Sequence, residues 1–234
     1  PETIQNTGVR TEQAQMAAFG TAVRSYGDVT ENVRLQTDIA GRVSGWVQDL
    51  KFKAEGDEVK KGELLFTLDS PELISAQQDY ISALQTGVQG RIGAAERRLR
   101  SLGVQNSVIK TIRKNRKAEI YMPFYAESDG VISMISIREG TYVKPGMMVM
   151  QIQDYASVWA EVSIAEQDIP YIDETTKVMV SFPNLGIQET RAKIDYIYPT
   201  IDRATRTGRV RLVLDNPDTV SYTHLRAHET KAKL

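Results

Sequence analysis

The chain has 234 residues, of which 41% are hydrophobic and 25% are charged, and its formal net charge is −1. These values are typical of a globular protein with a sizeable core, and they give no overall electrostatic case for nucleic-acid binding. The absence of cysteine excludes disulfides, thiolate metal sites and cysteine nucleophiles. No run of about 18 apolar residues is present that could span a membrane.

The first 40 residues are predicted to be mainly β structure. Residues 9–16, 19–26 and 32–39 are rich in β-prone side chains and are separated by glycines. The chain opens at Pro1 with neither an initiator methionine nor a signal peptide. We therefore expect an export or anchor segment upstream of it.

A repeat in two separated halves is the most informative feature of the sequence. The first half is Gly45–Leu68 and the second is Gly130–Ile152. Each half contains a G-x5-G turn, Gly56–Gly62 or Gly140–Gly146, followed by alternating apolar residues that predict a strand. The glycines suit turn positions with positive φ. The two halves are predicted to pair into one flattened β-sandwich of the lipoyl/biotinyl type.

Between the halves, the pattern changes to helical spacing at Ser70. The Ser70 hydroxyl is predicted to cap a helix, with Pro71 at the first helical position and Glu72 in the first turn. Gly87 and Gly90 are predicted to break this helix.

Two further helices are predicted before the second half-repeat. One contains Ile92–Leu102 and stops at Gly103, which suits the position after a C-cap. Asn106 or Ser107 can cap a third, short helix. Residues 71–119 are thus predicted to form a compact helical hairpin with an extra helical segment.

Several strands are predicted after the second half-repeat, and their spacing with turn signals suggests a small β-barrel. Residues 165–171 between them have a helical pattern. The predicted strands are 158–162, 178–182, 190–198 and 208–214.

A split lipoyl-like unit that holds a helical hairpin beside a β-barrel resembles the periplasmic adaptor (membrane fusion) proteins of RND-type efflux systems, in particular the heavy-metal, copper/silver branch. The resemblance covers about residues 20–218, and its most specific element is the run from Ser70 to Tyr80. Glu127 departs from the family pattern, which has proline there. Further matching elements are Gly45–Val47, Gly56–Gly62, Arg97–Gly103, Asp129–Ile132, Arg138–Gly146, Val158–Trp159 and Thr205–Thr207.

The expected fold is mainly β and multidomain with an α insert: a β-barrel, a split lipoyl/biotinyl-like β-sandwich and a short α-helical hairpin. The family's closing barrel strand is missing after Asp218, and residues 221–234 are polar, without a visible strand partner, and resemble a translated sequencing-adapter fragment. We expect the natural protein to continue there with another sequence. The parts are a membrane-proximal remnant (1–17), the barrel (18–36 plus 154–220), the sandwich (37–70 plus 120–153), the hairpin (71–119) and a non-native or disordered tail (221–234).

The resemblance implies a non-enzymatic adaptor in the periplasm, associated with the inner membrane. It would link an inner-membrane RND pump to an outer-membrane efflux channel as a route for heavy-metal cations, and it would self-associate into a ring. No cofactor, catalytic residue, metal ligand or nucleic acid is implied. The hairpin tip is expected to face the channel, with Gly87, Gly90, Arg91, Arg97 and Arg98 as candidate contact residues.

Nine basic residues lie between Arg91 and Lys117 against one acid, Glu96. Such a run is typical of a solvated helix face. Alternatively, it steers the hairpin tip onto an acidic partner surface. No catalytic motif such as G-x-S-x-G, H-E-x-x-H or a Walker loop is present in the chain.

Three other functions are alternatives to this one. A multidrug or ABC-type exporter could replace the metal pump as partner. A lipoyl or biotinyl carrier would present a modified lysine between the halves, but Leu68–Glu72 occupies that position and opens into a helix. A metal chaperone would need a ligand set. The soft thioether sulfur of methionine suits Cu(I). Met148 and Met150, however, fall on the predicted inward face of a strand, which favours core packing. Met147 is predicted to point to the opposite face.

The two histidines and the two tryptophans each have a simple interpretation. His224 and His228 have the i,i+4 spacing that can chelate a metal on a helix, but no third ligand is evident. Trp46 and Trp159 begin strands and are expected to pack in a core or at a domain seam.

Overall fold

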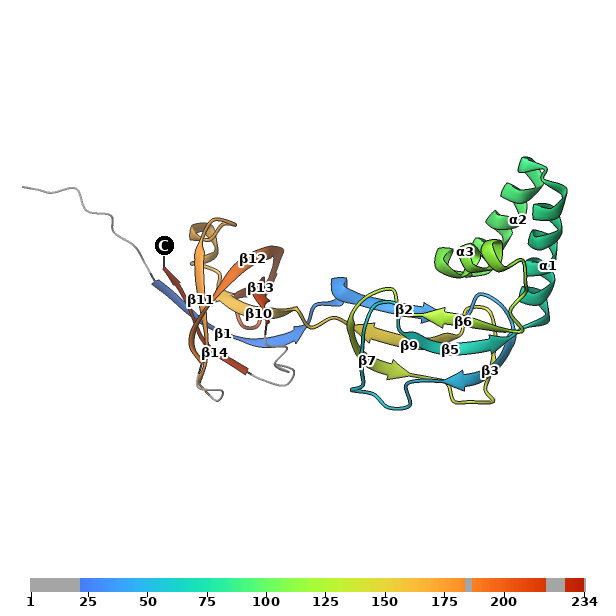
Figure 1. Ribbon diagram of the computed structural model, residues 1–234. Coiled ribbons are helices and arrows are strands. Elements are labelled where there is room, and N and C mark those ends of the chain that lie inside the picture. Colours follow the sequence, from blue (N-terminus) through green and yellow to red (C-terminus); the bar gives the residue numbers. More distant parts are fainter. Residues whose placement is uncertain (1–21, 184–186, 218–225, 234) are drawn as a thin grey trace, which may run out of the picture. The chain divides into compact units, whose positions relative to one another are not determined.

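The computed structural model describes residues 22–183, 187–217 and 226–233 (Figure 1). The chain divides into two compact units. The barrel unit contains the described residues up to Asp28, Ala160–Val213 and the strand that begins at Arg226. The sandwich unit contains Val29–Trp159 and Leu214–Pro217. Among the described residues, no helix has both the length and the hydrophobicity needed to cross a membrane.

Six strands form a closed barrel in the order β1-β10-β13-β12-β11-β14. Its core follows period two, since Val178 and Val180 are buried on one strand and Val210 and Leu212 on another. This confirms the barrel that the sequence predicts. The strands are β1 (Ala22–Glu31), β10 (Ser157–Ala165), β11 (Lys177–Phe182), β12 (Ile187–Asp202), β13 (Thr207–Asp215) and β14 (Arg226–Lys233).

The helical pattern at residues 165–171 gives only a short 3-10 helix, η2 (Ile169–Tyr171). The preceding strand β10 extends to Ala165, and the connection is closed by i→i+3 bonds, in which Asp168 N–H donates to Ala165 C=O at 2.9 Å. Pro170 removes a backbone donor from the segment, so an α-helical bond ladder is not propagated there.

The expectation that residues 221–234 have no strand partner is wrong for the part that is described. β14 pairs antiparallel with β1 and with β11, and Ala232 lies opposite both Val23 and Val178. The polar side chains of this segment do not exclude a strand, because the hydrogen bonds between strands are made by backbone N–H and C=O groups. Val9–Met16 and His224 lie outside the described residues.

The sandwich consists of two four-stranded sheets, β2-β9-β7-β4 and β6-β5-β3-β8. Each sheet contains strands from both half-repeats, because β4 of the first half pairs with β7, and β8 of the second half pairs with β3. The predicted pairing of the two halves is confirmed. The strands are β2 (Gln36–Ala40), β3 (Gly45–Leu50), β4 (Glu58–Val59), β5 (Leu64–Asp69), β6 (Tyr121–Tyr125), β7 (Gly130–Ile135), β8 (Tyr142–Val143) and β9 (Met148–Gln153).

Equivalent glycines of the two halves make equivalent hydrogen bonds. Gly62 N–H donates to Ala126 C=O, and Gly146 N–H donates to Gly41 C=O, both at 2.8 Å. Both glycines have positive φ, +84° and +81°, as the G-x5-G motif predicts. Each turn is therefore hydrogen-bonded to the residues that immediately precede the other half in the sequence.

The predicted alternation of buried and exposed residues fails in β5. Leu65, Phe66 and Leu68 are all buried, in one apolar core that also contains Tyr80 and Ile112 of the helical insert. Because the sandwich interior covers one face of the strand and further apolar groups cover the other, a continuous apolar run replaces the alternating pattern.

The insert contains three helices, α1 (Pro71–Thr86), α2 (Gln89–Ser101) and α3 (Asn106–Asn115). Gly87 ends α1 in the left-handed region at φ 71°, as predicted. The prediction that Gly90 also breaks a helix is wrong, since it lies in the first turn of α2. The extended backbone of Val88 already separates the two helices, so no second break is needed.

The predicted caps also differ from those observed. Ser70 occupies the N-cap position of α1, but its buried hydroxyl makes no capping hydrogen bond. Gln105, rather than Asn106 or Ser107, is the N-cap of α3. Its side-chain amide bonds the backbone of Tyr125, which holds Gln105 in an extended conformation just before the helix.

A polar network joins chain segments at the end of the sandwich unit, beside the 3-10 helix η1 (Val33–Leu35). The Tyr155 hydroxyl donates to Glu31 at 2.8 Å, and the Asn216 side chain donates to Tyr155 C=O at 2.8 Å. Burial, and then the hydrogen bond to Glu31, raise the pKa of Tyr155 to about 12.

Gly45→Ala and Gly130→Ala are each expected to destabilise the sandwich by about 1–3 kcal/mol. A Cβ would lie 2.5 Å from Asp69 C=O at the first site and 2.7 Å from Gln153 C=O at the second. Gly90→Ala is the control, since its Cβ meets nothing within 4 Å and should raise the helix stability slightly. Urea unfolding measures all three. Unchanged stability in the first two variants would contradict the close strand packing.

Tyr155→Phe is expected to reduce the loss of stability at high pH. The folded protein holds the tyrosine proton more tightly than the unfolded chain, whose tyrosine pKa is about 10. The contribution is therefore intact below about pH 10 and is lost as the pH rises towards 12. Thermal unfolding between these pH values should show a smaller decline in the variant than in the wild type and in the exposed control Tyr171→Phe. Equal declines would contradict the assigned bond.

Candidate functional site

Three of the five predicted contact residues lie together at the hairpin tip. Gly87, Gly90 and Arg91 flank or follow the turn between α1 and α2, and Val88 in that turn is 50% exposed. A Cβ added at Gly87 or Gly90 would meet no heavy atom within 4 Å. The tip is therefore an open surface, accessible to a partner.

Arg97 and Arg98 lie further along α2, about 9 Å and about 10.5 Å from Arg91 at 1.5 Å per residue. The Arg98 guanidinium contacts the Asp79 carboxylate of α1 at 2.5 Å. Arg98 thus joins the two helices of the hairpin. Arg91 and Arg97 are exposed and make no ion pair with any described residue.

Glu96, the one acid in the basic stretch, is used within the insert. Its carboxylate contacts Arg100 at 2.5 Å and Arg113 of α3 at 2.9 Å. Arg113 Nε also donates to the hydroxyl of the fully buried Tyr80 at 2.9 Å. These contacts connect all three helices, which makes the tip a preorganised surface.

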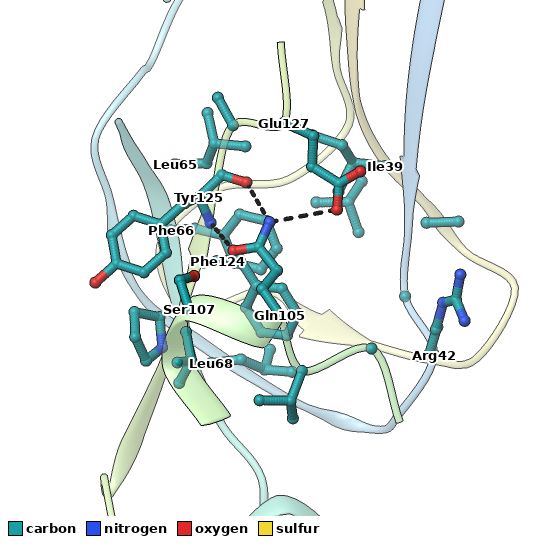
Figure 2. Close-up of a pocket in the computed structure, with 18 of the residues that line it drawn as sticks. Ile39, Arg42, Leu65, Phe66, Leu68, Gln105, Ser107, Phe124, Tyr125 and Glu127 are labelled. Carbon is teal, nitrogen blue, oxygen red and sulfur yellow. Dashed lines mark hydrogen bonds between the residues drawn. The ribbon is translucent and has the colours of Figure 1, made fainter. Parts of the chain in front are cut away.

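Two glutamine amides attach the insert to the sandwich. Gln77 donates to Glu119 C=O at 2.9 Å and accepts from Glu119 N–H at 2.8 Å. Gln105 does the same to Tyr125, at 2.7 and 3.1 Å, and its amide also approaches Glu127 (Figure 2). Gln105 thus pairs with the last residue of β6, the outer strand of its sheet, and Gln77 pairs with a residue just before that strand. A lone glutamine has no sequence signature, so this attachment was not predicted.

A groove of about 1290 Å³ lies between the outer strands β2 and β6 and beneath the α2–α3 connection. Buried apolar side chains, Leu65, Phe66 and Leu68, line its floor (Figure 2). Pro123 lies on the β6 side, where the missing N–H limits pairing with another strand. The sequence did not indicate this groove, because it arises only when the two halves meet.

Among the described residues, no group of three or more His, Cys, Asp or Glu could hold a metal ion. Met150 is fully buried, as predicted, whereas Met148 is only half-buried because it begins its strand. Met147, predicted to point away, is partly buried against the same core. Pro71, where a carrier would present its lysine, begins α1.

The two tryptophans differ in their surroundings. Trp159 is 7% exposed, as predicted for packing, whereas Trp46 is 52% exposed and the prediction for it is wrong. Trp46 lies opposite Tyr142 across β3 and β8, with ring centroids 4.9 Å apart. No described element covers that face of the sheet, so the pair remains in solvent.

Comparison with protein families gives two matches. Residues 36–153 match the family described as "CusB, barrel-sandwich hybrid domain", and residues 157–220 match "CusB-like, beta-barrel domain". SilB of Salmonella typhimurium is 27% identical over 219 residues, and the cation efflux system protein CusB of Escherichia coli (strain K12) is 26% identical over 221 residues. Each alignment covers 93% of this chain, but only 51% of SilB and 54% of CusB, so the chain spans about half the length of these relatives.

Solved structures share the fold. ZneB from Cupriavidus metallidurans is 17% identical with a TM-score of 0.57, over 93% of this chain and 100% of that one. A MacA-MexA chimeric protein, which contains the Pseudomonas aeruginosa MexA alpha-hairpin domain, is 18% identical with a TM-score of 0.60, over 95% and 85%. Together with the split sandwich, the inserted helices and the barrel, the family matches show that this chain belongs to the CusB-like family of membrane fusion proteins.

Proposed function

We propose that this chain is part of the periplasmic adaptor of a tripartite efflux system, linking an inner-membrane RND transporter to an outer-membrane channel. The observation that carries the proposal is the split sandwich, whose two halves enclose a rigid helical hairpin with an exposed tip. Such a construction presents a surface for docking. We assign it no catalytic role and no cofactor.

Heavy-metal cations are the proposed substrate class, and copper or silver ions fit it best. The support is the likeness to CusB, whose name describes a cation efflux system protein. The adaptor would act in the periplasm beside the inner membrane, as copies arranged in a ring. An exporter of other compounds, multidrug or ABC-type, is the alternative, since the MacA-MexA chimera has a similar fold.

The hairpin tip is the proposed contact with the channel. Gly87 and Gly90 leave the backbone open there, Arg91 provides exposed positive charge at the tip, and Arg97 adds another exposed positive charge further along α2. Exposed charges of this kind mainly accelerate association with an acidic surface and are screened by salt. Arg98 has a different proposed role, because its pairing with Asp79 keeps α2 in place behind the tip.

Reversing two exposed charges of α2, Arg91→Glu at the tip with Arg97→Glu about 9 Å behind it, is expected to lower resistance to silver and copper ions in the native host. The reason is repulsion from an acidic channel surface. The matched control is Lys110→Glu with Lys114→Glu on α3, which changes the net charge equally at exposed positions away from the tip. Growth across a series of metal concentrations is the measurement.

Two outcomes would contradict the proposal. Wild-type resistance in the tip variant, with normal protein levels, would exclude the tip as the contact. Unchanged resistance to silver and copper after deletion of the whole gene, with increased sensitivity to organic compounds, would replace heavy-metal cations by another substrate class. Tight Ag(I) binding by the isolated chain in a competition titration would instead favour metal handling by the chain itself.

A further inference from the structure

The edge of the sandwich at β6 is built from an apolar segment without charge. Residues 120–126 contain no charged residue and include three aromatic rings. Within this segment, β6 forms one outer strand of its sheet, whereas the outer strand on the other side, β8, has only two residues. Short uncharged segments of high β propensity pair readily with strands of other molecules when they lie at the edge of a sheet.

The outer side of β6 borders the groove. Ala126, just after the strand, accepts a hydrogen bond from Gly62 N–H at 2.8 Å, in the turn that precedes β5. Backbone groups of successive residues point to alternate sides of a strand, so those of Tyr121, Pro123 and Tyr125 point away from β5. All three residues line the groove, and Tyr121 is 49% exposed. A strand from another molecule could therefore reach this edge.

Two residues interrupt the hydrogen bonds that this edge could offer. Pro123, at the centre of β6, has no N–H to donate. At the end of the strand, the side-chain amide of Gln105 occupies both backbone groups of Tyr125, since it donates to the C=O at 2.7 Å and accepts from the N–H at 3.1 Å (Figure 2). A second strand would find partners at the start of β6 but not along its whole length, and pairings that short do not persist.

Acidic residues flank the uncharged segment on both sides. Glu119 directly precedes it and Glu127 directly follows it. If two β6 edges paired with each other, in either strand direction, these like charges would be brought together, which opposes the pairing. Glu127 is also the residue that departs from the family pattern, and its carboxylate lies 3.4 Å from the Gln105 amide (Figure 2). The departure thus places a charge beside the residue that covers the edge.

We infer that Gln105, Pro123 and the two flanking glutamates keep the β6 edge from pairing with a strand of another molecule. Gln105 has the main part, because it occupies from within the chain the position at Tyr125 that an added strand would take. The inference is independent of the proposed function, since it concerns a contact that the chain avoids. It gives the α2–α3 connection a second task besides fastening the insert to the sandwich.

Opening the edge should convert the folded chain into strand-paired aggregates. The variant is Gln105→Ala with Pro123→Val, which frees the backbone of Tyr125 and restores an N–H at the centre of β6. Under conditions in which circular dichroism shows a folded chain, sedimentation should show a loss of soluble protein that the wild type does not undergo, and thioflavin T should stain the sediment. Gln77→Ala is the matched control, because it removes the same pair of bonds at Glu119, outside β6, and should stay soluble.

A charge at the edge separates this effect from a loss of stability. Adding Tyr121→Lys to the double variant should restore solubility, since an exposed lysine on an edge strand opposes pairing, while the melting temperature stays as low as in the double variant. Hydrogen exchange gives a second readout. The Tyr125 amide should lose its protection in soluble Gln105→Ala and regain it in the sediment of the double variant, whereas the Ala126 amide, bonded to Glu63 C=O, should stay protected throughout.

Four results would overturn the inference. The first is a folded double variant that stays soluble, and the second is an equal loss of soluble protein in folded Gln77→Ala. The third is sediment that still forms after Tyr121→Lys is added. The fourth is sediment in which the Tyr125 amide exchanges freely. All of these tests use the purified full chain, so their outcome is separate from that of the resistance tests on the hairpin tip.

Discussion

The exchange of short strands between the two half-repeats is the constraint on which the sandwich unit depends. β4 and β8 have two residues each, and each pairs with a strand of the opposite half. Isolated pairings of this length are too weak to persist, so they are stable only within the completed sandwich. Residues around position 40 and around position 150 are thereby held side by side, with Ile39 opposite Met150.

This arrangement explains how a small β unit supports a helical projection. The insert begins after β5 and ends before β6, which are neighbouring antiparallel strands. The chain therefore leaves and re-enters the sandwich at the same place. Gln77 and Gln105 then fasten the helices to the backbone before and at the end of β6. The same fastening leaves the groove open between β6 and β2, which makes one side of the sandwich recessed while the Trp46 face remains exposed.

Features that depend on local chemistry could be predicted from the sequence. The G-x5-G turns and the end of α1 at Gly87 follow from positive φ, and the barrel strands follow from period two. Features that depend on distant residues could not. The exposure of Trp46 depends on which element covers its sheet. The role of Gly90 depends instead on the extended backbone of the nearby Val88, which its residue type does not determine. The same holds for the predicted contact residues. That Arg98 is paired with Asp79, and so differs from Arg91 and Arg97, is visible only in the fold.

Native-state hydrogen exchange on the whole chain tests the central claim most directly. If the two halves form one cooperative unit, the amides of Gly62 and Gly146, which donate across the halves, should open with the same free energy as the core strands β5 and β9. Protection that is lost from one turn while the other half stays protected would contradict the account, since each half would then be stable without its counterpart.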